Sequence, residues 1–326
     1  MAHDRYGRNI NYVRVSLTDV CNLRCVYCMP EDMSFRPRQD LMQTEEVCRL
    51  VSLLAGIGFT KFRLTGGEPT LRDDLVPIVQ HISAAPGVEV TGITTNAILL
   101  KRLAAPLADA GLQRVNISID TVDPAKFQQM TRWGNIRDVW DGIDAAERAG
   151  LAIKLNAVVV RGFNDCTDAV ELARLTLDRP WQVRFIEVMP FGSLAEFQKA
   201  HIVAEHELRG TISEELGQME LQNDGRLDGE ARLYRLAGAQ GELGFISSVT
   251  NPFCAGCNRA RLTPDGKLRL CLLRDKELDL LRLMRGGASE DELRTMIEDS
   301  IWYKPWGHGL AKDVHPQHRV MSEIGG

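Results

Sequence analysis

Apolar and polar residues alternate in six short runs within the first 190 residues, and longer segments with apolar residues at helical spacing separate these runs. The short runs predict strands, and longer segments such as 44–55 and 136–149 predict helices. Thr44 is expected to cap the first of these helices. Six strand–helix units in succession predict a parallel sheet. The expected strands are residues 12–17, 61–65, 88–94, 114–119, 152–160 and 182–188.

The alternation gives each expected strand one apolar face and one polar, partly cationic face. In the first strand, Val13 and Val15 lie on one face, whereas Arg14 and Ser16 lie on the other. A doubly covered sheet or a closed barrel would carry apolar residues on both faces. We therefore predict an α/β fold with an incomplete (β/α)6 barrel of the TIM type, whose polar inner face lines a cavity. The alternative, a sheet with one face in solvent, is mainly a property of antiparallel sheets.

The strand–helix alternation stops near residue 190. It is followed by a helical stretch at 194–217, a polar and glycine-rich segment, several short strands and a helix at 290–303. We therefore predict two domains: residues 1–190 form the barrel, and residues 191–326 form a smaller α+β domain that caps it.

Composition and charge restrict the class of protein. The chain has 326 residues, of which 44% are hydrophobic and 25% charged, as in ordinary globular proteins. A net charge of −5 gives no overall basic field, so neither nucleic acid nor anionic lipid is expected as a partner. No apolar run reaches the roughly 18 residues of a membrane-spanning helix, and the first residues lack the apolar core of a secretory signal. We therefore expect a cytoplasmic protein without a membrane partner.

The chain has eight cysteines, which a cytoplasmic protein keeps reduced, so their clustering indicates metal or redox chemistry. Cys48 and Cys166 lie at helical positions and are expected to be small, buried side chains. The other six form two groups of three, namely Cys21, Cys25 and Cys28, then Cys254, Cys257 and Cys271.

The first group has the spacing C-x3-C-x2-C and follows the first expected strand, at the end where βα barrels carry their chemistry. Three thiolates at this spacing can hold three corners of a [4Fe–4S] cube and leave the fourth iron open. The alternative is a zinc site completed by a ligand from elsewhere, because Cys25 and Cys28 alone have the C-x2-C spacing of zinc ribbons.

These residues resemble the signature of the radical S-adenosylmethionine (SAM) superfamily, in which an aromatic residue, here Tyr27, precedes the third cysteine. The superfamily's glycine-rich motif is matched by Gly66, Gly67, Glu68 and Pro69 after the second expected strand. The resemblance implies that the open iron binds SAM and that one electron cleaves SAM to a 5′-deoxyadenosyl radical. The glycines would let the backbone approach SAM, and Glu68 would accept a hydrogen bond from its ammonium group.

The second group again provides three thiolates without an obvious fourth cysteine. It predicts either a second cluster with one open iron or a zinc site completed by a histidine such as His308 or His315. The spacing alone leaves both interpretations open.

The residues around this second group resemble the GTP 3′,8-cyclase family, which catalyses the first step of molybdenum cofactor biosynthesis. The resemblance rests on Cys254-Ala-Gly-Cys257-Asn-Arg259-Ala-Arg261 and on further motifs in order along almost the whole chain. It departs from the family pattern at Ala97, where glycine is usual. The family uses two [4Fe–4S] clusters, and the second contacts the guanine base of GTP.

The resemblance also implies ligand contacts. Arginine and lysine suit a triphosphate because their charge-assisted hydrogen bonds to anions are strong. The tail Gly325-Gly326 is implied to reach the active site. The expected catalytic residues are Cys21, Cys25, Cys28, Arg259 and Arg261. SAM would be bound by Tyr27, Gly66, Gly67, Glu68, Ser118 and Met189, and GTP by Arg14, Arg63, Thr94, Lys154, Arg259 and Arg261.

The implied reaction is abstraction of the ribose 3′ hydrogen of GTP by the SAM-derived radical, followed by attack of the carbon radical on guanine C8. The product would pass to a cyclic pyranopterin monophosphate synthase, an external one-electron reductant would supply the clusters, and a homodimer is a further expectation. The alternatives are a radical SAM enzyme that modifies peptides, a class that usually has more C-terminal cysteines, and a zinc-stabilised binding module without chemistry.

Overall fold

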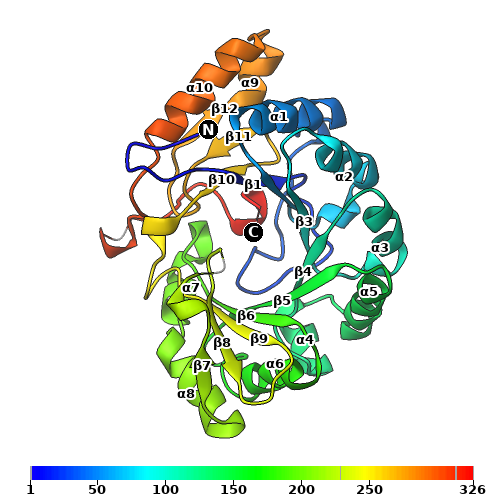
Figure 1. Ribbon diagram of the computed structural model, residues 1–326, viewed down its shortest axis with the longest axis vertical. Coiled ribbons are helices and arrows are strands. Elements are labelled where there is room, and N and C mark those ends of the chain that lie inside the picture. Colours follow the sequence, from blue (N-terminus) through cyan, green and yellow to red (C-terminus); the bar gives the residue numbers. More distant parts are fainter. Residues whose placement is uncertain (1, 228, 313, 326) are drawn as a thin grey trace.

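The structure is a computed structural model that describes residues 2–227, 229–312 and 314–325. In this part of the chain, twelve strands form one continuous sheet in the order β12-β11-β10-β1-β2-β3-β4-β5-β6-β9-β8-β7. Figure 1 shows the sheet curving around a central space, with helices on its outer side and the C-terminus near the centre. The strands are β1 (Tyr12–Ser16), β2 (Lys61–Thr65), β3 (Val90–Thr95), β4 (Arg114–Ser118), β5 (Ala152–Val159), β6 (Gln182–Glu187), β7 (Met219–Leu221), β8 (Arg232–Leu236), β9 (Glu242–Ile246), β10 (Arg259–Leu262), β11 (Lys267–Arg269) and β12 (Glu277–Asp279).

Strands β1 to β6 are parallel neighbours, which confirms the predicted series of strand–helix units. The sheet begins at β12 and ends at β7 without closing among the described residues, so the predicted incomplete barrel is also confirmed. The helices are α1 (Thr44–Ile57), α2 (Leu75–Ala84), α3 (Leu100–Asp109), α4 (Pro124–Thr131), α5 (Ile136–Arg148), α6 (Thr167–Asp178), α7 (Ala195–Ala200), α8 (Glu205–Leu216), α9 (Leu280–Arg285) and α10 (Glu290–Trp302).

The core lies between the sheet and these outer helices. Val13 and Val15 of β1 are fully buried, as are Leu50 and Leu54 of α1, because the apolar stripe of the helix covers the apolar face of the strands. The first residue of α1 differs from its predicted role. Gln43 is the N-cap and forms a capping box with Glu46, whereas Thr44 lies inside the helix.

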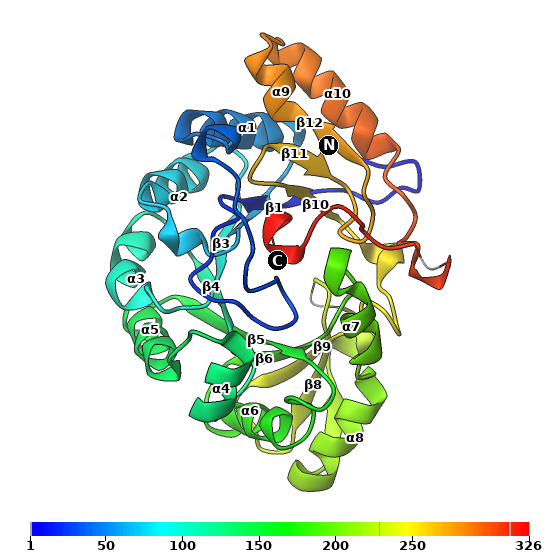
Figure 2. The same cartoon turned by 180° about the vertical axis from the view of Figure 1, so that it is seen from behind.

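The C-terminal half extends the sheet at both of its edges. β9 pairs with β6, and β10 pairs with β1, both in parallel, which gives eight parallel strands within the described residues. The hairpin strands β7–β8 and β11–β12 then continue the two edges in antiparallel fashion. Figure 2 shows, from behind, the β10–β12 side and the β8–β9 side on either side of the central space. The domain boundary near residue 190 remains a prediction, since both halves share this sheet.

Two further sequence expectations can be compared with the structure. Cys166 is exposed at the start of α6, so its predicted burial is wrong, and Cys48 is only partly buried on α1. Ala97, at the position where the family usually has glycine, has a positive φ of 65°. Glycine adopts this left-handed conformation without a steric penalty, which explains the family's preference. Across the described part of the chain, the helices are too short or too polar to span a bilayer.

Candidate active site

The inner face of the sheet carries rows of polar side chains, as the alternation predicted. The register aligns Arg261 of β10, Arg14 of β1 and Arg63 of β2 across three neighbouring strands. A second row aligns Asn116 of β4 with Lys154 of β5. Like charges on adjacent strands repel one another, so such a row is stable only with anionic partners nearby.

Both cysteine groups line one chamber, together with Arg14 and Arg261 of the first polar row. It contains about 1940 Å³ of empty space, part of which is open to solvent. The chamber extends from one cysteine group to the other. The cysteines in its lining are Cys21, Cys25, Cys28, Cys254, Cys257 and Cys271.

The two cysteine groups lie at opposite ends of the strand pair β1–β10. The first group follows the C-terminal end of β1. Cys257 precedes the N-terminal end of β10, which runs parallel to β1, and Cys271 follows the antiparallel strand β11 at that same end. The arginines of β1 and β10 lie between the two groups. A ligand that touches both ends must therefore pass along a cationic wall.

The glycine-rich motif packs directly on the first cysteine loop. The backbone N–H of Gly67 donates to the Thr18 carbonyl at 2.6 Å, and that of Glu68 donates to the Val20 carbonyl at 2.8 Å. A Cβ at Gly67 would overlap the carbonyls of Asp19 and Val20. Gly66 and Gly67 both line the chamber. At Gly67, contact with the cysteine loop leaves no room for a side chain.

Replacing Gly67 with alanine is therefore expected to displace the first cysteine loop. We expect the free energy of unfolding to fall by about 1–3 kcal/mol, as for other overpacked sites, and the iron content of the purified protein to decrease. The matched control is Gly210→Ala, on an open helical position where a Cβ meets no atom within 4 Å. Thermal melting and iron analysis of the two variants test this, and an unchanged iron content in Gly67→Ala would contradict it.

Glu68 is buried and joins the C-terminal ends of β2 and β3. Its carboxylate accepts hydrogen bonds from the backbone N–H of Thr70 at 3.0 Å, the Thr95 hydroxyl at 2.7 Å and the Asn96 N–H at 2.7 Å. Burial nevertheless raises the pKa of Glu68 above its usual value. Glu68 lines the chamber, as a contact with SAM requires. The contact itself, with the ammonium group of SAM, stays a prediction.

Tyr27, the aromatic residue of the first motif, is held by a side chain that sequence analysis did not select. Its hydroxyl donates to Asp120 at 2.8 Å, and Asp120 also accepts from the backbone N–H of Val158. Burial raises the pKa of Asp120 to about 6, although both hydrogen bonds oppose this effect. Tyr27, Asp120 and the predicted SAM contacts Ser118 and Met189 all line the chamber.

Burial disfavours the thiolate form of the first three cysteines. Burial raises the pKa of Cys21 to about 11 and that of Cys28 to about 12, and it raises the pKa of Cys25 well above its usual value. Iron binds the thiolate, so loading of a cluster must release these protons. Three free thiols on one short loop have the donor chemistry that a [4Fe–4S] cube with one open iron requires.

The second group has a different electrostatic environment. Burial raises the pKa of Cys257, but the charges of Lys304 and Arg259 outweigh this effect and lower the pKa to about 7. Lys304 is buried, and its ammonium group donates to the carbonyls of Arg259, at 2.7 Å, and Leu270. Lys304 therefore connects the two segments that carry this group and favours the thiolate of Cys257, whereas burial raises the pKa of Cys271 above its usual value. Sequence analysis did not identify this role, because a lone lysine is normally exposed.

The donor geometry can be compared with the zinc alternative. Within the described residues, no three His, Cys, Asp or Glu side chains are arranged around one ion position. A cube does not require such an arrangement, because each thiolate binds a different iron. His308, one of the histidines suggested for zinc, lines the chamber, whereas the side chain of His315 contacts Gln317.

The predicted GTP residues divide into two sets. Arg14, Thr94, Arg259 and Arg261 line the chamber. Arg63 and Lys154 are not among the described residues of its lining. Arg63 donates a hydrogen bond to the Tyr12 hydroxyl at 2.6 Å. The positive charge of the neighbouring arginines changes the pKa of this hydroxyl. Burial would raise the pKa of Tyr12, but the charges of Arg63 and Arg14 lower it to about 8.

One acidic residue, which sequence analysis missed, lies among these arginines. Glu230 contacts Arg14 at 2.7 Å and Arg259 at 3.3 Å, and all three line the chamber. The Arg259 guanidinium also lies over the Phe253 ring, 4.6 Å from its centroid. Burial and the neighbouring charges of Arg14 and Arg259 lower the pKa of Arg261 well below its usual value, so this part of the chamber has an excess of positive charge.

The C-terminal tail enters the same space. Arg261 donates to the carbonyl of Gly325, and a Cβ at Gly325 would lie 2.8 Å from Cβ of Ser16 on β1. Gly325 also has a positive φ of 88°, so both its conformation and its surroundings favour glycine. Its expected partner Gly326 lies outside the described residues.

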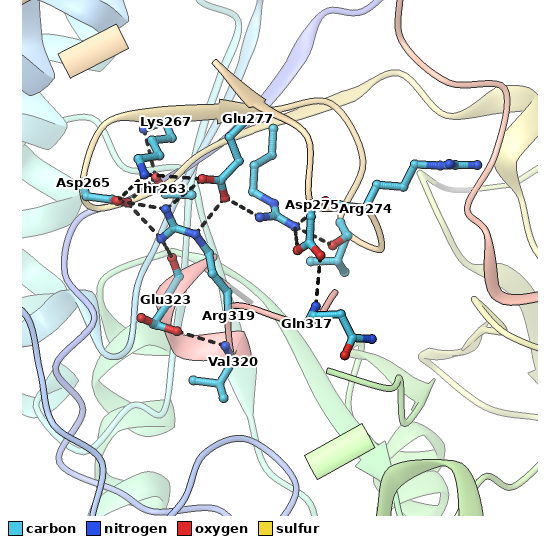
Figure 3. Close-up of polar contacts among 12 residues, drawn as sticks. Thr263, Asp265, Lys267, Arg274, Asp275, Glu277, Gln317, Arg319, Val320 and Glu323 are labelled. Atoms are coloured by element: carbon cyan, nitrogen blue, oxygen red, sulfur yellow. Dashed lines mark hydrogen bonds and ion pairs between the residues drawn. The ribbon is translucent and has the colours of Figure 1, made fainter. Parts of the chain in front are cut away.

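A buried ion-pair network holds the tail in place (Figure 3). The Arg319 guanidinium contacts Asp265 at 2.8 Å and Glu277 at 2.7 Å, and it donates to the Glu323 carbonyl at 3.2 Å. Asp265 and Glu277 belong to the β10–β12 region. The tail is therefore anchored on the segment that also carries Cys271.

Comparison with known proteins agrees with this site. The chain matches the model of the radical SAM superfamily over residues 15–175 and that of Molybdenum Cofactor Synthesis C over residues 181–310. GTP 3′,8-cyclases from Moorella thermoacetica and Thermodesulfovibrio yellowstonii are 44% and 43% identical to it, over 99% of each chain. The enzyme of that name from Pseudomonas putida is 43% identical over 94% of this chain and 92% of its own.

The chain belongs to the GTP 3′,8-cyclase family. The family's cofactors are SAM and two [4Fe–4S] clusters, as the resemblance implied, and the donor sets described above fit both clusters. Membership also decides against the two other functions considered from the sequence, a peptide-modifying radical enzyme and a zinc-stabilised binding module.

Among solved structures, Streptococcus suis SuiB bound to its precursor peptide SuiA is similar, with a TM-score of 0.59. The match covers 90% of this chain and 67% of SuiB, but only 14% of the residues are identical. At that identity the likeness shows the shared fold alone. It agrees with the assignment of a radical SAM barrel extended by a C-terminal region.

Proposed function

We propose that this protein converts GTP to (8S)-3′,8-cyclo-7,8-dihydroguanosine 5′-triphosphate, the first step of molybdenum cofactor biosynthesis. The observation that carries the proposal is the chamber, in which two cysteine triads lie at opposite ends of an arginine-lined wall. Membership in the GTP 3′,8-cyclase family supports the same conclusion.

We infer that Cys21, Cys25 and Cys28 hold the cluster that binds SAM. Tyr27, Gly66, Gly67, Glu68, Ser118 and Met189 surround this end of the chamber and would bind SAM. When bound, SAM and this cluster supply the radical that removes the ribose 3′ hydrogen. The protein contributes position, because the Gly67 and Glu68 backbone contacts hold the cysteine loop against the end of β2.

At the other end, Cys254, Cys257 and Cys271 would hold the second cluster, which offers an open iron to the guanine base. Arg14, Arg259 and Arg261 would neutralise the triphosphate between the two ends, with Thr94 beside them. Arg63 and Lys154 would act from the same polar face of the sheet. Held in this way, the ribose faces the first cysteine group while the base faces the second.

The partners implied by this function extend the proposal. The product would pass to a cyclic pyranopterin monophosphate synthase, and an external one-electron reductant would supply the clusters. All eight cysteines are free, as befits a reducing cytoplasm. The exposed aromatic residues Tyr6, Trp302, Tyr303 and Trp306 offer a surface for a homodimer.

Deuterium transfer tests the proposed reaction. Anaerobically reconstituted protein, reduced and supplied with SAM and GTP labelled with deuterium at C3′, should yield 5′-deoxyadenosine that carries the label and an equal amount of cyclised nucleotide. Mass spectrometry of both products provides the measurement, and Cys25→Ala provides the inactive control. Unlabelled 5′-deoxyadenosine, or SAM cleavage without loss of GTP, would overturn the proposal.

A further inference from the structure

Glu230 is a buried carboxylate inside a chamber that otherwise suits an anion. It lies two residues before β8 and follows Gly229, whose φ is +67°. Only 6% of the residue is exposed, and it lies in the lining of the chamber. A carboxylate at this position opposes the binding of a polyanion, so its presence requires an explanation.

The carboxylate of Glu230 joins two arginines from neighbouring strands. One oxygen, Oε1, accepts from Nη2 of Arg14 at 2.7 Å, and the other, Oε2, lies 3.3 Å from Nη1 of Arg259. Two oxygens shared between two guanidinium groups reproduce the way in which arginines bind a phosphate group.

The charge of Glu230 is maintained by its surroundings. Burial would raise its pKa, but the charges of Arg259, Arg14, Arg184 and Arg63 outweigh burial and lower the pKa strongly. Glu230 is therefore an ion at neutral pH. A buried guanidinium without a partner is costly, so in the absence of an anionic ligand Glu230 stabilises the arrangement of Arg14 and Arg259.

We propose that Glu230 occupies the place of a phosphate group in the substrate-free enzyme, and that the triphosphate of GTP displaces it from Arg14 and Arg259. This inference rests on the proposed function. The inference has a consequence for specificity. A ligand that displaces the Glu230 carboxylate must itself supply negative charge to Arg14 and Arg259, and a triphosphate supplies several charges. A neutral guanine compound gains nothing from these two arginines.

The contrasting role for Glu230 is a direct contact with GTP. A carboxylate can accept hydrogen bonds from the guanine or ribose, and its removal would then weaken binding. The two roles predict opposite signs for the effect of the same substitution on affinity, so one measurement separates them.

Equilibrium binding to the holoenzyme tests the inference. With both clusters reconstituted under anaerobic conditions, Glu230→Gln should bind GTP and inorganic tripolyphosphate about tenfold more tightly than the unmodified enzyme. Its affinity for guanosine, which has no phosphate, should not change. Glu220→Gln, which removes the same charge from an exposed position on β7, should bind all three ligands as the unmodified enzyme does.

The stability of the variant provides a second readout. Without GTP, Glu230→Gln should melt at a lower temperature, because Arg14 and Arg259 lose their shared partner, and GTP should raise its melting temperature more than that of the unmodified enzyme. Glu230→Asp keeps the charge but shortens the side chain. It provides a folded variant of intermediate affinity if Glu230→Gln does not fold.

The outcomes separate this inference from the function on which it rests. If the unmodified enzyme neither binds nor cyclises GTP, the proposed function fails. If it does both, and Glu230→Gln binds GTP with equal or lower affinity, the displaced-carboxylate role alone is overturned.

Discussion

Replacing Cys271 with alanine is expected to abolish GTP cyclisation and to weaken GTP binding, while SAM binding persists. Cys271 follows β11 and is the third thiolate at the end of the chamber opposite the first triad. Loss of one of its three ligands should release the second cluster from the protein. We expect turnover to fall by about a hundredfold or more and iron to drop from about eight to about four per chain.

Iron analysis and separate measurements of GTP and SAM affinity test this expectation. Cys166→Ala is the matched control, because Cys166 is exposed at the start of α6 and does not line the chamber. An unchanged affinity for GTP in Cys271→Ala would show that no open iron at this end takes part in substrate binding.

Replacing Arg261 with alanine should separate SAM cleavage from cyclisation. Arg261 is buried, lines the chamber and donates to the carbonyl of Gly325. Removing one partner of a buried charged contact costs about 2–5 kcal/mol, so kcat/KM for GTP should fall by about a hundredfold or more. SAM lies at the other end of the chamber in our proposal, so its reductive cleavage should continue in part.

Product analysis provides the measurement for Arg261→Ala. The amounts of 5′-deoxyadenosine and cyclised nucleotide, equal in the unmodified enzyme, should diverge in the variant. Arg285→Ala is the control, because Arg285 pairs with Glu46 on the surface and does not line the chamber. Full cyclisation by Arg261→Ala would contradict a role for this arginine in holding the triphosphate.

The register between β1 and β10 explains why the C-terminal half is required for this chemistry. Tyr12 pairs with Arg259 and Arg14 with Arg261, so hydrogen-bonded strands fix the second cysteine group relative to the first. Arg319 then anchors the tail on the same region. The distance between the two proposed clusters is therefore set by a sheet rather than by a flexible connection between domains.

Much of the fold and the cysteine chemistry could be predicted from the sequence because the signals are local. Strand alternation identified the six parallel strands, and the spacing of Cys21, Cys25 and Cys28 after the first of them identified the first cluster loop. The family motif placed Arg259 and Arg261, two residues apart, beside the second group.

Contacts between distant parts of the chain could not be predicted in this way. The pairing of Arg14 with Glu230 joins residues 216 positions apart, and nothing near Glu230 in the sequence marks it as part of a site. Lys304 was missed for the same reason. The addition of β9 and β10 to the two edges also depends on tertiary contacts, because these strands are short and follow loops of varied length.

Glycine at position 67 has a second structural reason besides the one expected from the sequence. Sequence reasoning explained the glycines by a close approach of SAM. The structure shows that a side chain at Gly67 would overlap the Asp19 and Val20 carbonyls of the cysteine loop. Loop-to-loop packing, which is invisible in a single sequence, is therefore sufficient to require glycine here.

The central claim is that two clusters, each with one open iron, share one chamber and bind different ligands. Electron paramagnetic resonance of the reduced, oxygen-free protein tests this claim most directly, with SAM and GTP added one at a time. We expect two [4Fe–4S] signals, one that changes only with SAM and is lost in Cys25→Ala, and one that changes only with GTP and is lost in Cys271→Ala. A single cluster signal with bound zinc, or two signals that neither ligand alters, would contradict the claim.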